Sequence, residues 1–232
     1  GVLQPVAEAA ALVRAAGGVT VCDAAQAAGR VPLSMAALGV DALLVSAHKF
    51  GGPKGIGAVL YASERAKPVR ARSRGGGQER GMRAGTQNVA GAAGFAAAAR
   101  EALRDLASET ARLAALRDRA QAAVFAAAPD ATIFSAGAPR LPGTLAFAAP
   151  GLAAETLLIA LDLAGIAVSS GAACSSGKVA PSEILAAMGV PTPLARCALR
   201  VSLGHASTAA DVARFATAFA DAAARMRRAP AA

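Results

Sequence analysis

The sequence predicts an α/β fold in its first half, joined to a smaller α+β domain in its second half. Three observations support this prediction. The run DALLVSA, residues 41–47, is almost continuously apolar, which is typical of a buried parallel strand. Helix-like and strand-like segments alternate quickly before residue 62, as in sheets with crossover connections. After residue 130, short β-like runs are separated by helical stretches, which indicates strands with helices to one side.

The first half contains five expected elements and one long loop. Helix formers fill residues 5–16, and Gly17 and Gly18 stop them. A loop is expected at 73–88, SRGGGQERGMRAGTQN, which is too rich in glycine for a helix. The other expected elements are strands at 19–22, 41–47 and 57–62 and a short helix at 34–39.

A long helical pattern from residue 89 to 127 opens the second half, and Pro129 ends it. A helix of that length typically links two domains or spans one. We therefore divide the chain into residues 1–105 and 106–232. Beyond the long helix we expect strands at 131–134, 144–148, 166–170 and 199–203, and helices at 154–164, 181–188 and 209–227.

The composition argues against several classes of protein. The net charge is +9, but the basic residues are scattered and no aromatic residues alternate with them. An anionic cofactor or an acidic protein partner therefore fits better than nucleic acid. The longest uncharged run, residues 84–99, is too short to cross a membrane. Cys22, Cys174 and Cys197 form no CxxC motif, so neither a metal site nor a disulfide framework is expected, and a cytoplasmic protein is indicated.

Lys49 and Asp23 are the first candidates for chemistry. Lys49 follows the strand at 41–47, and ligands of open α/β sheets bind where the strands end. A partly desolvated lysine there can form a Schiff base with an aldehyde, although a surface lysine in a turn has the same sequence pattern. Asp23 ends the strand before it, and a buried carboxylate needs a positive partner such as a pyridinium nitrogen. Together the two residues indicate pyridoxal 5'-phosphate (PLP).

Further residues suit the other groups of this cofactor. Gln26 can donate a hydrogen bond to the phenolic oxygen of the ring. Ser46 and His48 flank the lysine and can donate to the phosphate, and Arg83 and Thr86 in the glycine-rich segment are further candidates. Neither GAACSSGKV nor GGPKGIG matches a Walker A or dinucleotide-binding motif, so a nucleotide phosphate is not indicated.

Two residues of the second half also stand out. Cys174 lies in SSGAACSSGK, where serine, glycine and alanine are typical of an exposed loop; such a thiol is either reactive or incidental. Arg200 has apolar neighbours on an expected strand, so we expect a buried guanidinium paired with an anion such as a carboxylate; a structural ion pair would satisfy the same pattern. Cys22 and Cys197 lie in apolar settings and are expected to pack.

The motifs resemble the cysteine desulfurases of the NifS/IscS type, which are PLP enzymes of the class V aminotransferase group and fold type I. DAAQAAG from Asp23, SAHKFGGPKGIG from Ser46 and GGGQERGMRAGTQN from Gly75 carry the resemblance, and it extends over essentially the whole chain. The resemblance implies that residues 1–105 are the C-terminal part of the PLP-binding large domain. Residues 106–232 would then form the small domain with the cysteine loop.

The resemblance also implies roles for the candidate residues. Lys49 would hold PLP covalently, with Asp23, Gln26, Ser46 and His48 around the ring and phosphate. Thr86 would reach the phosphate of the other subunit in a homodimer. Arg200 would bind the carboxylate of L-cysteine, and Cys174 would take the substrate sulfur as a persulfide.

The implied reaction converts L-cysteine to L-alanine and passes the sulfur to an acceptor such as an iron–sulfur scaffold protein. The family's catalytic domain begins before the equivalent of Gly1, so we expect the chain to correspond to roughly the last three-fifths of a desulfurase. Two alternatives remain open. One is a related lyase that acts on selenocysteine or cysteine sulfinate, and the other is an inactive fragment that serves as a dimerisation or scaffold-binding module.

Overall fold

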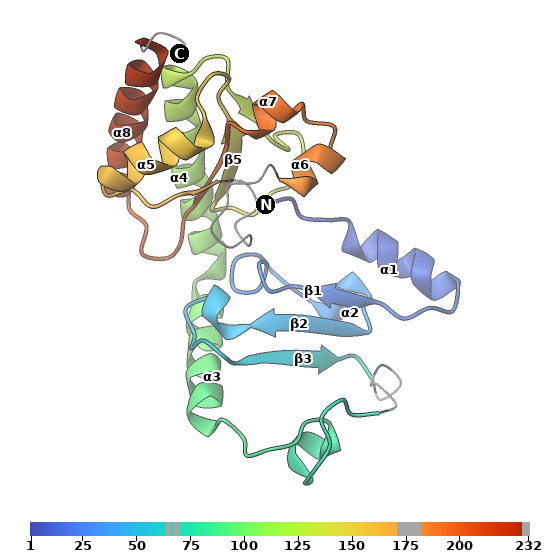
Figure 1. Ribbon diagram of the computed structural model, residues 1–232. Helices are drawn as coiled ribbons and strands as arrows, with labels where there is room; N and C mark the ends of the chain where they lie inside the picture. The colour runs from blue at the N-terminus through green and yellow to red at the C-terminus, as the bar shows by residue number, and fades with distance from the viewer. Residues whose placement is uncertain (64–65, 67–69, 171–181, 229–232) are drawn as a thin grey trace. The chain divides into compact units, whose positions relative to one another are not determined.

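The computed structural model of the chain describes residues 1–63, 66, 70–170 and 182–228 (Figure 1). The chain divides into two compact units. The N-terminal unit is Gln4–Ser108, and the C-terminal unit is Gly1–Leu3 with Glu109–Ala232. The division after Ser108 lies close to the one drawn from the sequence, but the first three residues group with the second half.

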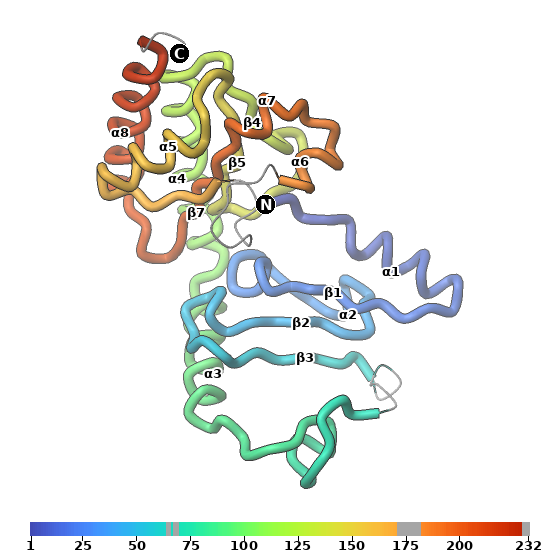
Figure 2. The backbone as a smooth tube through the Cα atoms, in the orientation of Figure 1, coloured from blue at the N-terminus to red at the C-terminus, as the bar shows by residue number. Residues whose placement is uncertain are grey.

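The N-terminal unit contains a three-stranded sheet in the order β1-β2-β3. β1 pairs with β2 in parallel, and β2 pairs with β3 antiparallel. The chain leaves β1, passes through α2 and returns to β2, which is the crossover that a parallel pair requires (Figure 2). The elements are α1 (Val6–Ala15), β1 (Val21–Asp23), α2 (Met35–Leu38), β2 (Ala42–Ser46), η1 (Ala47–Lys49), β3 (Gly57–Tyr61), η3 (Gln78–Gly81) and α3 (Val89–Arg104).

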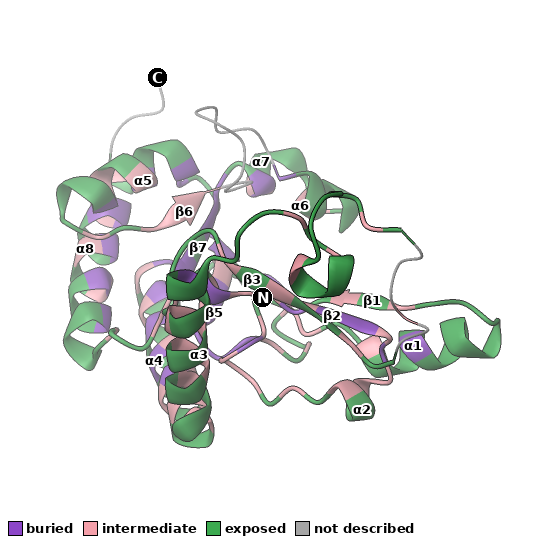
Figure 3. Ribbon diagram, turned by 90° about the horizontal axis from the view of Figure 1, so that it is seen from below, coloured by how far each residue is buried: buried purple, intermediate pink, exposed green. Residues whose placement is uncertain are grey.

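One face of this sheet packs against the helices that precede and follow β1. Cys22, Leu43 and Val45 alternate along β1 and β2 and join a cluster with residues of α1 and α2. The opposite face is more open, since Val21 and Val59 are exposed. Burial increases from the edge strand β1 to the central strand β2 (Figure 3). The apolar cluster therefore selects which face each strand residue occupies.

The long helical pattern of the sequence forms two helices rather than one. α3 ends at Arg104, and α4 (Leu106–Ala127) begins after Asp105. The backbone of Asp105 leaves helical geometry (φ −118°, ψ 23°), and its carbonyl accepts a hydrogen bond from the Ser108 hydroxyl. The expectation of a single helix was therefore wrong at this residue. Aspartate favours such a break because it is a poor residue for a helix interior.

The C-terminal unit contains a four-stranded sheet in the order β4-β5-β7-β6, with every pair antiparallel. The expected strand at 166–170 is reduced to its last two residues, because only these pair with β7. The helix α7 was not expected. The elements after α4 are β4 (Thr132–Ile133), β5 (Thr144–Ala148), α5 (Ala154–Leu163), β6 (Ser169–Ser170), α6 (Glu183–Ala187), α7 (Thr192–Ala195), β7 (Ala198–Ser202) and α8 (Ala209–Arg228).

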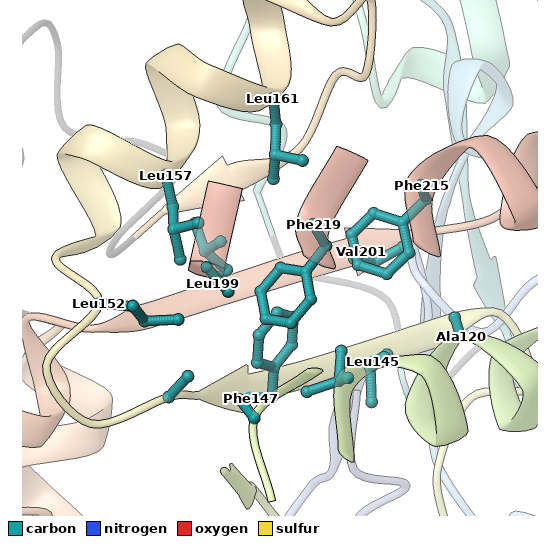
Figure 4. Close-up of a cluster of buried hydrophobic side chains, with 14 of the residues drawn as sticks. Ala120, Leu145, Phe147, Leu152, Leu157, Leu161, Leu199, Val201, Phe215 and Phe219 are labelled. Carbon is teal, nitrogen blue, oxygen red and sulfur yellow. The ribbon is translucent and has the colours of Figure 1, made fainter. Parts of the chain in front are cut away.

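The main core lies between this sheet and the helices α4, α5 and α8. Phe147 of β5 meets Phe219 of α8 edge to face, with ring centroids 5.5 Å apart, and Phe215 stacks on Phe219 (Figure 4). Leu157 of α5 is fully buried in the same cluster. The other face carries a smaller cluster around Phe134 and Cys197, against α6 and α7. Within the described residues, no helix combines the length and apolarity needed to cross a bilayer.

The core predicts the effect of removing its central ring. We expect Phe219→Ala to destabilise the chain by about 3–5 kcal/mol, because it removes a fully buried ring and leaves a cavity between α8 and β5. Chemical denaturation followed by circular dichroism measures this loss. Leu163→Ala is the control, since Leu163 is 84% exposed on α5 and its truncation is expected to cost less than about 0.5 kcal/mol. Equal losses for the two variants would contradict this description of the core.

Candidate active site

The parallel pairing of β1 and β2 brings two of the candidate residues to one edge of the sheet, the edge formed by the C-terminal ends of these two strands. Asp23 is in register with Leu44, and Ser46 lies two residues further along β2. Because side chains alternate along a strand, Asp23 and Ser46 leave the same face of the sheet. Lys49 closes the 3-10 turn η1, which follows β2 directly. The strands expected at 19–22 and 41–47 are thus neighbours in the sheet.

Three hydrogen bonds involve the candidate residues at this edge. The Ala25 N–H donates to Oδ1 of Asp23 at 2.9 Å, which holds the carboxylate over its own turn. The Oγ of Ser46 lies 2.9 Å from Nδ1 of His48, within hydrogen-bonding distance. Arg30 donates from Nη2 to the carbonyl oxygen of Lys49 at 3.2 Å. Arg30 was not singled out in the sequence, where only its place in the turn after β1 hinted at this contact.

The burial of Asp23 differs from the expectation. Asp23 and Gln26 are exposed, and Lys49 and Ser46 are half-buried. The prediction of a buried carboxylate was therefore wrong for this chain. The physical reason is that β1 is the edge strand of its sheet, so only β2 shields one side of it.

The turn after Lys49 is packed tightly against two glycines. A Cβ on Gly94 of α3 would lie 2.6 Å from Cγ of Pro53, and a Cβ on Gly29 would lie 2.8 Å from Cβ of Phe50. The ring of Phe50 also packs on Phe95 of α3, with centroids 5.6 Å apart. Since neither position has room for a side chain, α3 and the turn after β1 together hold the segment that carries Lys49.

Thr86 and Arg83 lie in the loop before α3 rather than on the β1–β2 edge. Arg83 donates from Nη1 to the carbonyl oxygens of Gly85 and Thr86, at 2.9 and 2.8 Å. Thr86 is exposed. The guanidinium of Arg83 thus shapes the loop, and the proposed contact of Thr86 with a phosphate stays a prediction.

Arg200 lies at the middle of β7 in the C-terminal unit. It is in register with Ala146 of β5 and Ser169 of β6. Its flanking residues Leu199 and Val201 are buried on the core face, so Arg200 projects from the other face and is exposed. The expectation of a buried guanidinium was wrong, because apolar neighbours along a strand point to the opposite face. Its side chain donates to two hydroxyls, Ser202 and Ser169.

Two of the three cysteines, Cys22 and Cys197, lie in the described residues. Cys197 is buried in the smaller cluster, and its thiol donates to the Pro193 carbonyl at 3.4 Å. Cys22 is half-buried beside α1 and α2, and this burial raises the pKa of its thiol. Both therefore pack, as expected, and a raised pKa makes Cys22 a poorer nucleophile. Cys174 lies outside the described residues.

Comparison with known proteins identifies the family. Residues 1–215 match the family model described as aminotransferase class-V. The chain belongs to the class-V aminotransferase family. It is 42% identical, over 99% of its length, to an IscS-like cysteine desulfurase of Mycobacterium tuberculosis, and 40% identical over 88% of its length to a cysteine desulfurase of Klebsiella pneumoniae. The resemblance inferred from the motifs is thereby confirmed.

Solved structures agree with this assignment. A NifS-like protein from Rickettsia africae superposes with a TM-score of 0.86 and 32% identity, covering 96% of this chain and 58% of that one. The chain spans 58% and 51% of the two desulfurases named above. The mixed α/β fold expected from the sequence is therefore confirmed as part of a longer class-V aminotransferase fold.

One further arginine organises the C-terminal unit of this class-V aminotransferase chain. Arg112 of α4 donates to the carbonyls of Ser207 and His205, at 2.6 and 3.1 Å, in the loop that follows β7. Glu109, one turn earlier, accepts two hydrogen bonds from the same guanidinium, at 2.7 and 2.8 Å. Arg112 and Glu109 therefore link the loop at the end of β7 to α4. The sequence offers only the i,i+3 spacing of the two charges as a signal.

The packing of the Lys49 turn predicts the effect of a side chain at position 94. Gly94→Val is expected to destabilise the chain by about 1–3 kcal/mol, because the new side chain collides with the rigid Pro53 ring. Hydrogen exchange at residues 47–52 is expected to accelerate. Ala93→Val is the matched control, since Ala93 is exposed on the same helix. Unchanged exchange in the Gly94 variant would contradict the contact.

The Glu109–Arg112 pair predicts a pH dependence of stability. The hydrogen bond from Arg112 lowers the pKa of Glu109 in the folded chain below its unfolded value of about 4.3. Its contribution is therefore present above pH 4.3 and lost as the pH falls through the lower folded pKa. Glu109→Gln is expected to cost up to about 1 kcal/mol at pH 7, since both side chains are partly exposed. Thermal unfolding at pH 7 and pH 3 tests this, and a cost that persists at pH 3 would contradict it.

Proposed function

We propose that the chain supplies the lysine side of a PLP site and the substrate-binding arginine of a cysteine desulfurase. The observation that carries this proposal is the parallel pairing of β1 and β2, which brings Asp23 and Lys49 to one edge. The family match and the desulfurase relatives support the choice of reaction. Since the chain spans about half the length of those relatives, the activity is proposed for the protein to which this chain contributes.

The residues at the edge fit the groups of PLP. The Lys49 amine suits the aldehyde, the Asp23 carboxylate can accept from a protonated ring nitrogen, and Gln26 follows in the same turn. The hydroxyl of Ser46 and the imidazole of His48, already 2.9 Å apart, form a polar pair that can donate to a phosphate. PLP bound there supplies an electron sink that makes the substrate Cα–H acidic. Lys49 then holds or returns the Cα proton at Nζ.

The remaining steps need Arg200 and Cys174. Arg200 would bind the carboxylate of L-cysteine through two parallel hydrogen bonds. The thiolate of Cys174 would attack the substrate sulfur, so that an S–S bond forms as the Cβ–S bond breaks. The electron pair of the broken bond stays on the carbon side, and Cβ gains a proton. The net change converts L-cysteine to L-alanine and leaves Cys174 as a persulfide. An acceptor thiolate would then attack the outer sulfur, so that a new S–S bond forms and Cys174 leaves as a thiolate.

The proposed assembly is a homodimer in which Thr86 binds the phosphate of the PLP held by the partner subunit. Its position in an exposed loop, with the carbonyl held by Arg83, is compatible with an intermolecular contact. An iron–sulfur scaffold protein is the acceptor we favour. Selenocysteine and cysteine sulfinate share the α-amino-acid end that Arg200 would bind, so they are the comparison substrates for any assay.

Covalent trapping tests the role of Lys49 without depending on turnover. The chain is incubated with PLP, reduced with borohydride and digested, and the labelled peptide is identified by mass spectrometry. We expect the label on Lys49, and a loss of at least about tenfold in Lys49→Ala. Lys54→Ala is the matched control, because Lys54 is exposed five residues further along the same turn region. Equal labelling of both lysines would contradict the assignment.

Sulfur transfer tests the role of Cys174. Alanine release from L-cysteine is followed with PLP in the full-length protein that contains this chain, with Cys174→Ser and Cys22→Ala compared. We expect the Cys174 variant to lose the persulfide and at least about a hundredfold in turnover, since a serine oxygen cannot accept the sulfur. Undiminished alanine release in that variant would refute the persulfide role.

A further inference from the structure

Among the residues that the structure describes, the guanidinium of Arg200 is held by neutral groups and not by a carboxylate. Nε donates to the Ser202 hydroxyl at 3.2 Å, and Nη2 donates to the Ser169 hydroxyl at 3.3 Å. The two serines come from different places in the sheet. Ser202 lies two residues along β7 on the same face, and Ser169 is the cross-strand partner of Arg200 on β6. Two strands therefore fix one side chain.

Several other arginines of this unit are paired differently. Arg112, Arg117 and Arg227 each bind an aspartate or glutamate within 4.0 Å. Arg200 forms no ion pair with any residue in the described ranges of the chain. Hydroxyls restrict the rotation of a guanidinium without cancelling its charge. The full positive charge of Arg200 thus remains available for an anion.

The pattern of donors also selects one edge of the guanidinium. Of its five N–H groups, the two serine contacts use one on Nε and one on Nη2. Within the part of the chain that the structure describes, both N–H groups of Nη1 and one of Nη2 remain without an acceptor. A carboxylate binds arginine best through two parallel N–H···O bonds, and the Nη1–Nη2 edge provides such a pair.

We propose that Ser169 and Ser202 are positioning residues, which hold Arg200 with its Nη1–Nη2 edge ready for the α-carboxylate of the amino-acid substrate. The inference rests on the proposed function, because it assumes that Arg200 binds that carboxylate. The serines touch the arginine and not the substrate. Their effect is on affinity: a guanidinium that is already oriented loses less rotational freedom when the ligand binds.

The first measurement needs no ligand. In the ¹⁵N-labelled chain, the Nε–H signal of Arg200 is assigned by its loss in Arg200→Lys. We expect Ser202→Ala to accelerate hydrogen exchange at this Nε–H by about tenfold, since the hydrogen bond that protects it is gone. Ser170→Ala is the matched control: Ser170 is the neighbouring residue on β6 and is in register with Leu199 instead. Equal exchange in the Ser202 variant and the unmodified chain would overturn the proposal.

The second measurement titrates the same chains and Arg200→Lys with L-alanine that is ¹³C-labelled at its carboxylate, and follows the signal of that carboxylate. We expect the apparent Kd to rise about threefold in Ser169→Ala and in Ser202→Ala, and about tenfold in the double variant. Ser202→Thr keeps the hydroxyl and is expected to retain the affinity. An unchanged Kd in the double variant would overturn the proposal.

Arg200→Lys separates the two hypotheses. A lysine cannot form the two parallel bonds, so L-alanine binding is expected to weaken by at least about tenfold. If Arg200→Lys binds L-alanine as well as the unmodified chain, the carboxylate role of Arg200 fails, and the positioning role fails with it. If Arg200→Lys weakens binding but the serine variants do not, only the positioning role fails.

Discussion

The register between β1 and β2 is the constraint on which the candidate site depends. Asp23 and Lys49 are separated by a turn, a helix and a strand, and only the pairing of Asp23 with Leu44 brings their segments to one edge. A slip of one residue would turn the Asp23 side chain towards α1 and α2. The apolar cluster formed by Cys22, Leu43 and Val45 prevents that slip, because it would expose those side chains. The core on one face thus determines the chemistry on the other.

The C-terminal unit uses the same division between faces. Leu199 and Val201 of β7 are buried against α5 and α8, and Arg200 between them leaves the opposite face. The hydroxyls beside it come from β7 itself and from β6. Since the strand cannot rotate without exposing its buried residues, the direction of the arginine follows from the packing of the core.

The sequence was sufficient for the elements whose patterns are local. The strands at 41–47 and 57–62 and the helix at 209–227 follow from apolar runs and periodicity, and the structure contains them. The break at Asp105 was missed because the residues on both sides of it are good helix formers. The strand expected at 166–170 was predicted too long, because the length of β6 is set by its pairing with β7 and not by its own composition.

For the candidate residues, too, the sequence predicts local position but not the contacts that depend on neighbouring strands. Asp23, Ser46 and Lys49 could be found from the sequence because each follows a recognisable strand. Their exposure could not, because it depends on whether a strand lies at the edge of its sheet. Arg30 and Arg112 act on backbone carbonyls, and a contact with a carbonyl leaves no residue-type pattern in the chain.

Exposure also determines what these side chains can contribute in this chain. An exposed carboxylate or guanidinium meets its ligand in surroundings with the high dielectric constant of water, where two unit charges 4 Å apart attract each other by only about 1 kcal/mol. Such a contact gains most from orientation, because orientation lowers the entropy cost of binding without requiring burial. The hydrogen bonds from the Ala25 N–H to Asp23 and from Arg200 to the two serine hydroxyls provide this orientation. Each contact restricts a charged group before a ligand arrives, and each leaves the charge of that group intact.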